Sequence, residues 1–350
     1  YSGIASNVDF DMSDKHVSLP DDVIVGIAYN TGDYGTSKIV LPGPYNSLNV
    51  GLEGAVSVGT DVNPDGMFWN TTHAPFYSDG GSAGVGTFRE DAATWSPYAL
   101  SIKLTAIPFP VVNTTASHGY FTIQDALNTA STGDTITVAA GTYTENPTIA
   151  TAVNLQGASG ATINGLVTIN AASTTVTGFS IINPNGNEGV LINGVGDVAV
   201  TNNKIDSIGT GSATGNIYGI YFQDGAADAA NVVIKDNTVK NIGKGTTSGN
   251  GSSGGIGIGD STGSSLITGL SITGNTISDV SANSTTPWTS GTSKGAYGIL
   301  LNHADDTQSG ATSGEIKNNS ICHLSGFWSH GIGLEGNTPN LTVTGNTLCD

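Results

Sequence analysis

The chain has 350 residues, of which 50 are glycine, and charged residues make up only 11% of it. Its net charge of −18 excludes nucleic acid and anionic membrane surfaces as natural partners. No run of about 18 apolar residues is present, so no membrane span is expected. A chain rich in Gly, Ser, Thr and Asn builds sheets and turns rather than helices, which predicts an all-β protein.

Residues 1–106 contain short apolar runs separated by turns rich in Pro, Gly and Asn, such as DVIVGIAY (22–29) and YALSIKL (98–104). This pattern is typical of an antiparallel β-sandwich. The segments DDVIVGIAYNTGDYG and FREDAATWSPYALSIKL resemble a jelly-roll-like module of secreted bacterial proteins, which is usually longer at its N-terminal side. We therefore expect a jelly-roll-like sandwich that is incomplete at Tyr1. No catalytic chemistry is attached to that module.

One turn of this first unit has the composition of a cation-binding loop. Asp61, Asn63 and Asp65 stand at alternate positions and are followed by glycine, as in the first half of a calcium-binding loop. The twelfth position is Thr72, not the glutamate that would bind calcium with both oxygens. The sequence therefore leaves two interpretations open, a calcium site and an ordinary turn. No other cofactor is expected.

A Pro/Thr/Ser-rich linker is predicted at 107–119, followed by a second unit at 120–350. Apolar residues at the spacing of a helix face predict a short amphipathic helix near 121–131. The helix and the run GDTITVAAGTYTE after it resemble the entry of the pectin-lyase-like right-handed β-helix family. In that family a helix covers the open end of the core.

The second unit repeats one pattern, an asparagine flanked by alternating apolar residues. Its copies are centred on Asn203, Asn237, Asn275, Asn319 and Asn346. A second ladder begins with glycine, as in Gly219-Ile220-Tyr221-Phe222. Two strands per repeat and spacings of 34, 38, 44 and 27 residues between the asparagines predict a parallel β-helix with variable loops. The resemblance above implies that it is right-handed.

Cys322 and Cys349 each follow a ladder asparagine by three positions, so they lie at equivalent places in neighbouring coils. Strands stack about 4.8 Å apart, which is within reach of a disulfide. A disulfide between the last two coils is predicted, and two free thiols are the alternative. An oxidising, extracellular or cell-surface location fits the disulfide. The last ladder strand reaches Asp350 without a cap, which predicts self-association through the last coil, with fibres as one form of the assembly.

The outer face of the second ladder is the expected ligand site. Strict alternation turns Gly219, Tyr221 and Gln223 outward. Loops beside this face carry Trp288 and Trp328, and aromatic rings stack on sugars. We therefore expect a glycan, a polysaccharide in particular, to bind at Tyr221, Trp288 and Trp328.

Two enzyme classes act on such ligands. A uronate lyase needs basic residues, yet residues 118–350 contain no Arg. A glycoside hydrolase needs paired carboxylates, for which Asp260, Asp305 and Asp306 are candidates. His330 lies in a Ser-His-Gly sequence similar to one in polygalacturonases, whose Asn-Thr-Asp and Arg-x-Lys elements are absent. Asp in glycine-rich turns also caps backbone amides, without any catalytic role.

A structural or adhesive role at the cell surface is therefore the expected function, with self-association, glycan binding or both. A glycoside hydrolase is the alternative. The low number of basic residues and the lack of a convergent charged cluster favour the first expectation over the second.

Overall fold

The structure is a computed structural model. It describes residues 9–10, 52–53, 68–70, 88–90, 99–100, 102–103, 105, 108–223, 228–243, 251–259, 267–282, 295–302, 313–335, 338 and 340–349. The chain divides into two compact units, Tyr1–Ile107 and Pro108–Asp350. Within the described ranges, no helix is long and apolar enough to cross a membrane.

The described part of the first unit consists of two antiparallel strand pairs. Strand β1 (Leu52–Glu53) pairs with β4 (Ala99–Leu100), and β2 (Phe68–Asn70) pairs with β3 (Phe88–Glu90). Most of the strands expected from the sequence of this unit, including 22–29, lie outside the described residues.

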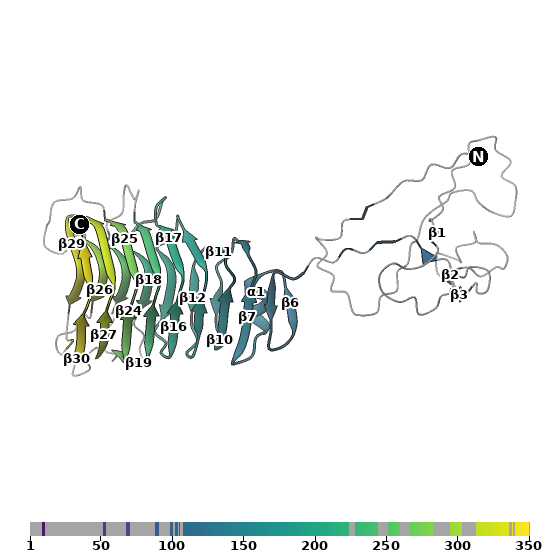
Figure 1. Ribbon diagram of the computed structural model, residues 1–350, viewed down its shortest axis with the longest axis horizontal. Helices are drawn as coiled ribbons and strands as arrows, with labels where there is room; N and C mark the ends of the chain where they lie inside the picture. Colours follow the sequence, from purple (N-terminus) through teal and green to yellow (C-terminus); the bar gives the residue numbers. More distant parts are fainter. Residues whose placement is uncertain are drawn as a thin grey trace, which may run out of the picture. The chain divides into compact units, whose positions relative to one another are not determined.

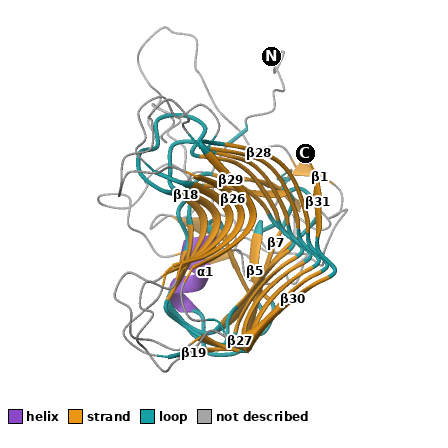
Figure 2. Cartoon of the chain, turned by 90° about the vertical axis from the view of Figure 1, so that its left-hand side faces the viewer, coloured by secondary structure: helices purple, strands orange, loops and turns teal. Residues whose placement is uncertain are grey.

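The second unit is a β-helix-like solenoid in which strands stack along three sheets (Figures 1 and 2). The ten-stranded sheet contains, in order from its N-terminal edge, β6 (His118–Tyr120), β5 (Val111–Asn113), β7 (Asp134–Val138), β10 (Val153–Gly157), β13 (Thr175–Thr177), β16 (Val198–Thr201), β20 (Val232–Lys235), β24 (Leu270–Thr273), β27 (Ser313–Lys317) and β30 (Asn340–Thr344). All its neighbours from β7 onward pair in parallel.

The other two long sheets are parallel throughout. The eight-stranded sheet contains β8 (Gly141–Tyr143), β11 (Ala161–Asn164), β14 (Ser180–Asn183), β17 (Lys204–Ile208), β21 (Thr238–Ile242), β25 (Thr276–Ser281), β28 (Ser320–Ser325) and β31 (Thr347–Cys349). The seven-stranded sheet contains β9 (Thr148–Ile149), β12 (Val167–Ile169), β15 (Glu188–Asn193), β18 (Ile217–Gln223), β22 (Ser253–Gly259), β26 (Gly295–Asn302) and β29 (Trp328–Glu335). A small pair, β19 (Ala229–Ala230) and β23 (Ile267–Thr268), lies beside them.

Each coil contributes one strand to each long sheet, and the inward side chains of the three strands meet in one core. In one coil these include Ile220, Ile234 and Val239, all fully buried. Because one face of every strand is covered in this way, the alternation of apolar residues fixes the register of the stack. The expectation of a stacked, parallel-strand solenoid is confirmed.

The ladder asparagines lie at the corner between the ten-stranded and eight-stranded sheets, and Asn203, Asn237, Asn275 and Asn319 are buried. Side-chain amides bond from coil to coil: Asn203 Nδ2 donates to Asn237 Oδ1 at 3.2 Å, and Asn237 Nδ2 donates to Asn275 Oδ1 at 3.0 Å. The residue before each ladder asparagine has a positive φ, so only Asn, Asp or Gly stands there, as Asp236 (54°) and Gly274 (67°) illustrate.

The second ladder of the sequence corresponds to the strands of the seven-stranded sheet from β15 onward. The glycine with which each of its copies begins, called the ladder glycine below, faces the core. A Cβ on Gly219 would meet the side chain of Val239 and, at 2.7 Å, the backbone oxygen of Gly255. The prediction that strict alternation turns Gly219 outward is therefore wrong. Both the glycine and the apolar residue after it, Ile220, point inward, and this local irregularity places Tyr218 on the same side of the sheet as Tyr221, away from the core, where Tyr218 is 6% exposed.

Replacing a core-facing glycine by alanine should destabilise the solenoid. A Cβ on Gly255 would meet the side chain of Ile277 and, at 2.8 Å, the backbone oxygen of Gly298. Since a backbone oxygen cannot move without displacing β26, we expect Gly255→Ala to lower the free energy of unfolding by about 3 kcal/mol. Urea unfolding followed by circular dichroism measures it.

The matched variant is Gly257→Ala, two residues further along the same strand. The three atoms nearest its new Cβ all belong to the ring of Tyr218, and a side chain can shift more easily than backbone. We therefore expect a smaller loss of stability than for Gly255→Ala. Equal losses in the two variants would contradict the inward orientation of Gly255.

The N-terminal end of the solenoid is closed by residues that the sequence assigned to a linker. The prediction of a linker over 107–119 is wrong, because β5 pairs antiparallel with β7, and β6 pairs antiparallel with β5. The exposed edge of β7 needs backbone partners, and this hairpin supplies them.

Helix α1 (Ile123–Thr129) lies within the range predicted for the cap and covers the same end of the core. Glu145 accepts hydrogen bonds from the backbone N–H groups of Ile123 and Gln124, at 3.0 and 2.9 Å. Gln124 in turn uses its side-chain amide to bond both backbone groups of Thr148, at 2.7 and 3.3 Å. The amide thus takes the place of a neighbouring strand at the edge strand β9.

In the last described coil, core-type side chains are exposed to solvent. Leu334, Val343 and Leu348 are 43%, 41% and 58% exposed. One coil earlier, the residues paired with them, Leu301, Ile316 and Ile321, are at most 1% exposed. This is the surface to which the expectation of self-association refers.

Candidate functional site

The outer face of the seven-stranded sheet carries a row of side chains that follows the solenoid axis. The row is made of the residues that stand directly before each ladder glycine and that pair from strand to strand, Glu188, Tyr218, Gly254, Tyr297 and His330. A second, parallel row contains Leu191, Tyr221, Gly257, Leu300 and Gly333. At about 4.8 Å per strand step, the first row is about 19 Å long.

Two tyrosine rings of β18 stack on each other on this face. The ring centroids of Tyr218 and Tyr221 are 4.7 Å apart and the ring planes differ by 9°. The Tyr218 ring lies over the next strand, where a Cβ on Gly254 or Gly257 would come within 2.6 Å of it. Tyrosine and glycine thus complement each other, because the bare backbone of β22 leaves room for a ring.

The arrangement recurs two strands further on. The ring of Tyr297 on β26 stacks on the imidazole of His330 on β29, with centroids 5.4 Å apart and planes that differ by 11°. A Cβ on Gly333 would lie 3.1 Å from the Tyr297 ring. Stacked planar groups therefore lie on this side of the sheet at two places along the solenoid, each next to a glycine of a neighbouring strand.

Two more aromatic side chains stand at the C-terminal end of this face. Phe327 and Trp328 are 44% and 42% exposed, and their rings contact each other edge to face at 5.5 Å. Trp328 begins β29, the strand that carries His330. Large exposed aromatic rings are costly in water and commonly mark a binding surface.

One carboxyl group lies at the other end of the row. Glu188 is half-buried and stands opposite Tyr218 on the neighbouring strand. Burial raises the pKa of the Glu188 carboxyl above its ordinary value. Its backbone is fixed by Asn183, whose Nδ2 donates to the Glu188 carbonyl oxygen at 2.7 Å.

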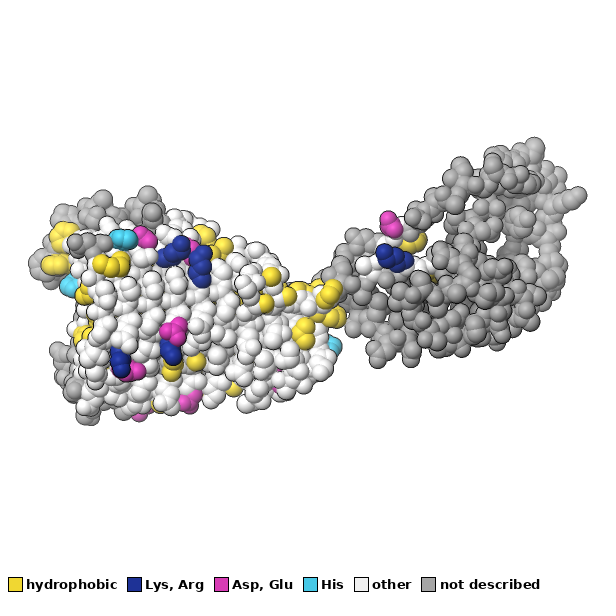
Figure 3. Space-filling model, in the orientation of Figure 1, with side chains coloured by type: hydrophobic (Ala, Val, Ile, Leu, Met, Phe, Trp, Pro, Cys, Tyr) yellow, Lys and Arg dark blue, Asp and Glu magenta, His cyan; other side chains and the backbone are white. Residues whose placement is uncertain are grey.

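The described lysines of the solenoid lie on the other two sheets. Burial raises the pKa of Asp206 on β17, but hydrogen bonds from Asn241, Ser207 and Lys204 and the charge of Lys240 outweigh it, so this pKa is lowered overall. The two lysines lie 3.3 and 3.4 Å from the Asp206 carboxylate. Figure 3 shows one face of the molecule, where few charged groups lie scattered among uncharged polar ones.

The structure tests the predicted site residues only in part. It places Tyr221, Trp328 and His330 on the seven-stranded sheet. The remaining candidates, Trp288, Asp260, Asp305, Asp306, Asp61, Asn63 and Asp65, lie outside the described residues. Among the residues that are described, no group of three or more His, Cys, Asp or Glu side chains could hold a metal ion.

Three residues of the face were missed by sequence reasoning, namely Glu188, Tyr218 and Tyr297. Each directly precedes a ladder glycine, as His330 does. Listing the residues at that position in all copies would have identified the row. Strict alternation through the glycine hid it, because the glycine itself points inward.

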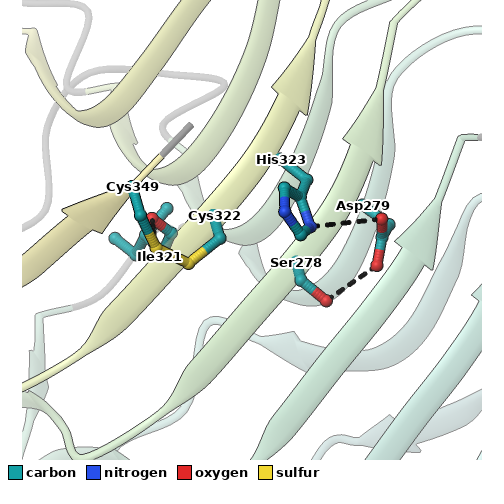
Figure 4. Close-up of a disulfide and its surroundings, with 6 residues drawn as sticks. All are labelled: Ser278, Asp279, Ile321, Cys322, His323 and Cys349. Carbon is teal, nitrogen blue, oxygen red and sulfur yellow. Dashed lines mark hydrogen bonds and ion pairs between the residues drawn. A yellow bond between two sulfur atoms is a disulfide. The ribbon is translucent and has the colours of Figure 1, made fainter.

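The predicted cysteine pair lies on the eight-stranded sheet, where Cys322 of β28 and Cys349 of β31 are directly opposite each other and joined by a disulfide (Figure 4). Next to it, His323 Nδ1 lies 3.6 Å from the Asp279 carboxylate, which also accepts a hydrogen bond from Ser278 Oγ at 2.9 Å. The disulfide ties the last described coil to the one before it.

Comparisons of the chain with family models, with characterised proteins and with solved structures give no match. The class of protein is therefore defined by the fold alone, a β-helix-like solenoid with parallel sheets.

Proposed function

We propose that this is an extracellular or cell-surface adhesive protein that binds an elongated glycan along the outer face of its seven-stranded sheet. The observation that carries the proposal is the pair of stacked ring arrangements, Tyr218 with Tyr221 and Tyr297 with His330, on one face. Sugar rings have apolar faces that pack on aromatic side chains, and sugar hydroxyls bond to polar groups beside them.

The shape of the face supports an extended ligand rather than a small one. The row from Glu188 to His330 is straight, because it follows paired positions of consecutive strands, and its length of about 19 Å suits several sugar units in line. The exposed Trp328 lies at the end of this row. We assign the solenoid to the right-handed, pectin-lyase-like kind, since crossovers between parallel strands are almost always right-handed.

Binding without hydrolysis is the better interpretation of the described residues. A glycoside hydrolase needs two carboxyl groups about 5–9.5 Å apart across the sugar bond. Among the side chains described on this face, Glu188 is the only carboxyl group. The hydrolase alternative therefore depends on Asp260, Asp305 and Asp306. Release of reducing ends from a polysaccharide panel, lost in Asp305→Ala or Asp260→Ala, would establish it.

The binding proposal predicts that Tyr221→Ala and Trp328→Ala each weaken the best ligand of a polysaccharide panel at least about tenfold, or about 1.4 kcal/mol. The reason is the loss of ring surface on which a sugar packs. Affinity electrophoresis selects the ligand, and titration calorimetry with an oligosaccharide of it measures the Kd.

The matched control is Val233→Ala, which removes an apolar side chain from the outer face of the ten-stranded sheet. This variant should bind as the unaltered protein does. Melting curves show whether each variant is folded. Unchanged affinity in both aromatic variants, or an equal loss in Val233→Ala, would rule out this face as the binding site.

A further inference from the structure

We infer that the glycan bound on the seven-stranded sheet carries no carboxylate groups, and that Glu188 is the residue that discriminates against acidic glycans. The inference rests on the proposed function and specifies its ligand class. It starts from the position of Glu188, which is the first member of the row that continues with Tyr218.

Glu188 is placed where a sugar packed on Tyr221, the more exposed of the two tyrosines, would come near it. Its neighbour across the strand pair is Tyr218, whose ring stacks on Tyr221. Both neighbours of Glu188 in the chain are fixed: Gly189 faces the core, and Asn187 Nδ2 donates to the carbonyl oxygens of Thr214 and Asn216 at 2.7 and 3.0 Å. The backbone of Glu188 is therefore held at the position paired with Tyr218.

Among the described residues, this face offers an acidic sugar no lysine or arginine. The strands of the seven-stranded sheet contain neither Lys nor Arg. The described lysines on the other two sheets include Lys204 and Lys240, which pair with Asp206, and Lys235, which pairs with Asp236 at 3.7 Å. Within the described part of this face, a uronate bound on the rings would thus meet a carboxyl group without a lysine or arginine beside it.

Partial burial makes this repulsion stronger than between two surface charges. The effective dielectric constant around a half-buried group is lower than in water, so a second negative charge nearby costs more. The same burial raises the pKa of Glu188, because the charged form is poorly solvated. A neutral sugar avoids the cost, since its hydroxyl groups can donate hydrogen bonds to the carboxylate.

The experiment compares oligosaccharides of equal length in neutral and acidic pairs, namely glucose with glucuronate, galactose with galacturonate and mannose with mannuronate oligomers. Kd values are measured by calorimetry at pH 8 and constant ionic strength. In the pair that binds best, we expect the neutral member to bind at least about tenfold more tightly. Glu188→Gln should tighten the acidic member at least about threefold and reduce the ratio of the acidic to the neutral Kd by at least that factor.

The control variant Glu315→Gln makes the same change on the outer face of the ten-stranded sheet and should leave the ratio of the two Kd values as it was. An acidic member that binds as tightly as its neutral partner would overturn the inference and leave the proposed function standing. The inference would also be overturned, with the proposed function still standing, if Glu188→Gln left the ratio of the two Kd values unaltered or if Glu315→Gln altered it equally. Absence of binding by all six oligomers, with Tyr221→Ala indistinguishable from the unaltered protein, would overturn both.

Discussion

Replacing Asn275 by alanine is expected to lower the free energy of unfolding by about 4 kcal/mol or more, the largest effect of any single substitution proposed for this protein. The Asn275 side chain makes four hydrogen bonds. Its Oδ1 accepts from the backbone N and the Nδ2 of Asn237, at 2.9 and 3.0 Å. Its Nδ2 donates to Ile234 O at 2.9 Å and to Asn319 Oδ1 at 3.0 Å.

The loss is large because the partners of Asn275 remain buried. Asn237 and Asn319 are each 1% exposed, so water cannot replace the missing amide without opening the corner. A buried polar group left without a partner costs about 1–3 kcal/mol. Coils contact only their neighbours, so the loosening should be greatest in β20, β21, β27 and β28. Urea unfolding gives the total loss in the free energy of unfolding, and hydrogen exchange detected by mass spectrometry shows which strands are loosened.

Asn154→Ala is the matched control, because Asn154 lies on the outer face of the same ten-stranded sheet, where its side chain is partly exposed. We expect a change within about 0.5 kcal/mol for this variant. Should Asn275→Ala unfold at the same urea concentration as Asn154→Ala, the amide ladder would contribute nothing specific to stability.

Removal of the Cys322–Cys349 disulfide is expected to have the second largest effect. The bond closes a loop with a sequence separation of 27 residues. By the loop-closure relation, a loop of this length is worth about 3.5 kcal/mol through the entropy of the unfolded chain. We expect the double variant Cys322→Ser/Cys349→Ser to lose about this much stability, with faster hydrogen exchange in β29, β30 and β31.

Reductant provides the internal control for this prediction. It should add about 2 Da to the mass of the unaltered protein and reproduce the exchange pattern of the double variant, because one bond takes up two hydrogens. It should leave the double variant unchanged. Identical melting of the unaltered protein with and without reductant would show that the bond does not hold the last described coil.

Much of the solenoid could be predicted from the sequence because its determinants repeat locally. The alternation around Asn203, Asn237 and the later asparagines specifies a strand, a turn that only Asn, Asp or Gly can make, and a second strand. Repetition then places like residues above one another, so equal offsets from the asparagines were enough to pair Cys322 with Cys349.

Other features depended on tertiary contacts. The segment 107–119 looks like a linker by composition, but the bare edge of β7 requires backbone partners, and the β5–β6 hairpin meets that requirement. Likewise, the inward turn of Gly219 follows from the closeness of Val239 and of the next coil's backbone, which no local pattern reveals.

The amino-acid sequence by itself determined the class of fold and the coil register, because these follow from the order of apolar and polar residues within each repeat. The tertiary structure alone decided which side chains share the outer face. One row contains Glu188, Tyr218, Tyr297 and His330 only because the residue directly before the ladder glycine points outward in each strand and pairs with its counterpart in the next strand. The raised pKa of Glu188 is likewise a product of burial, which exists only in the folded chain.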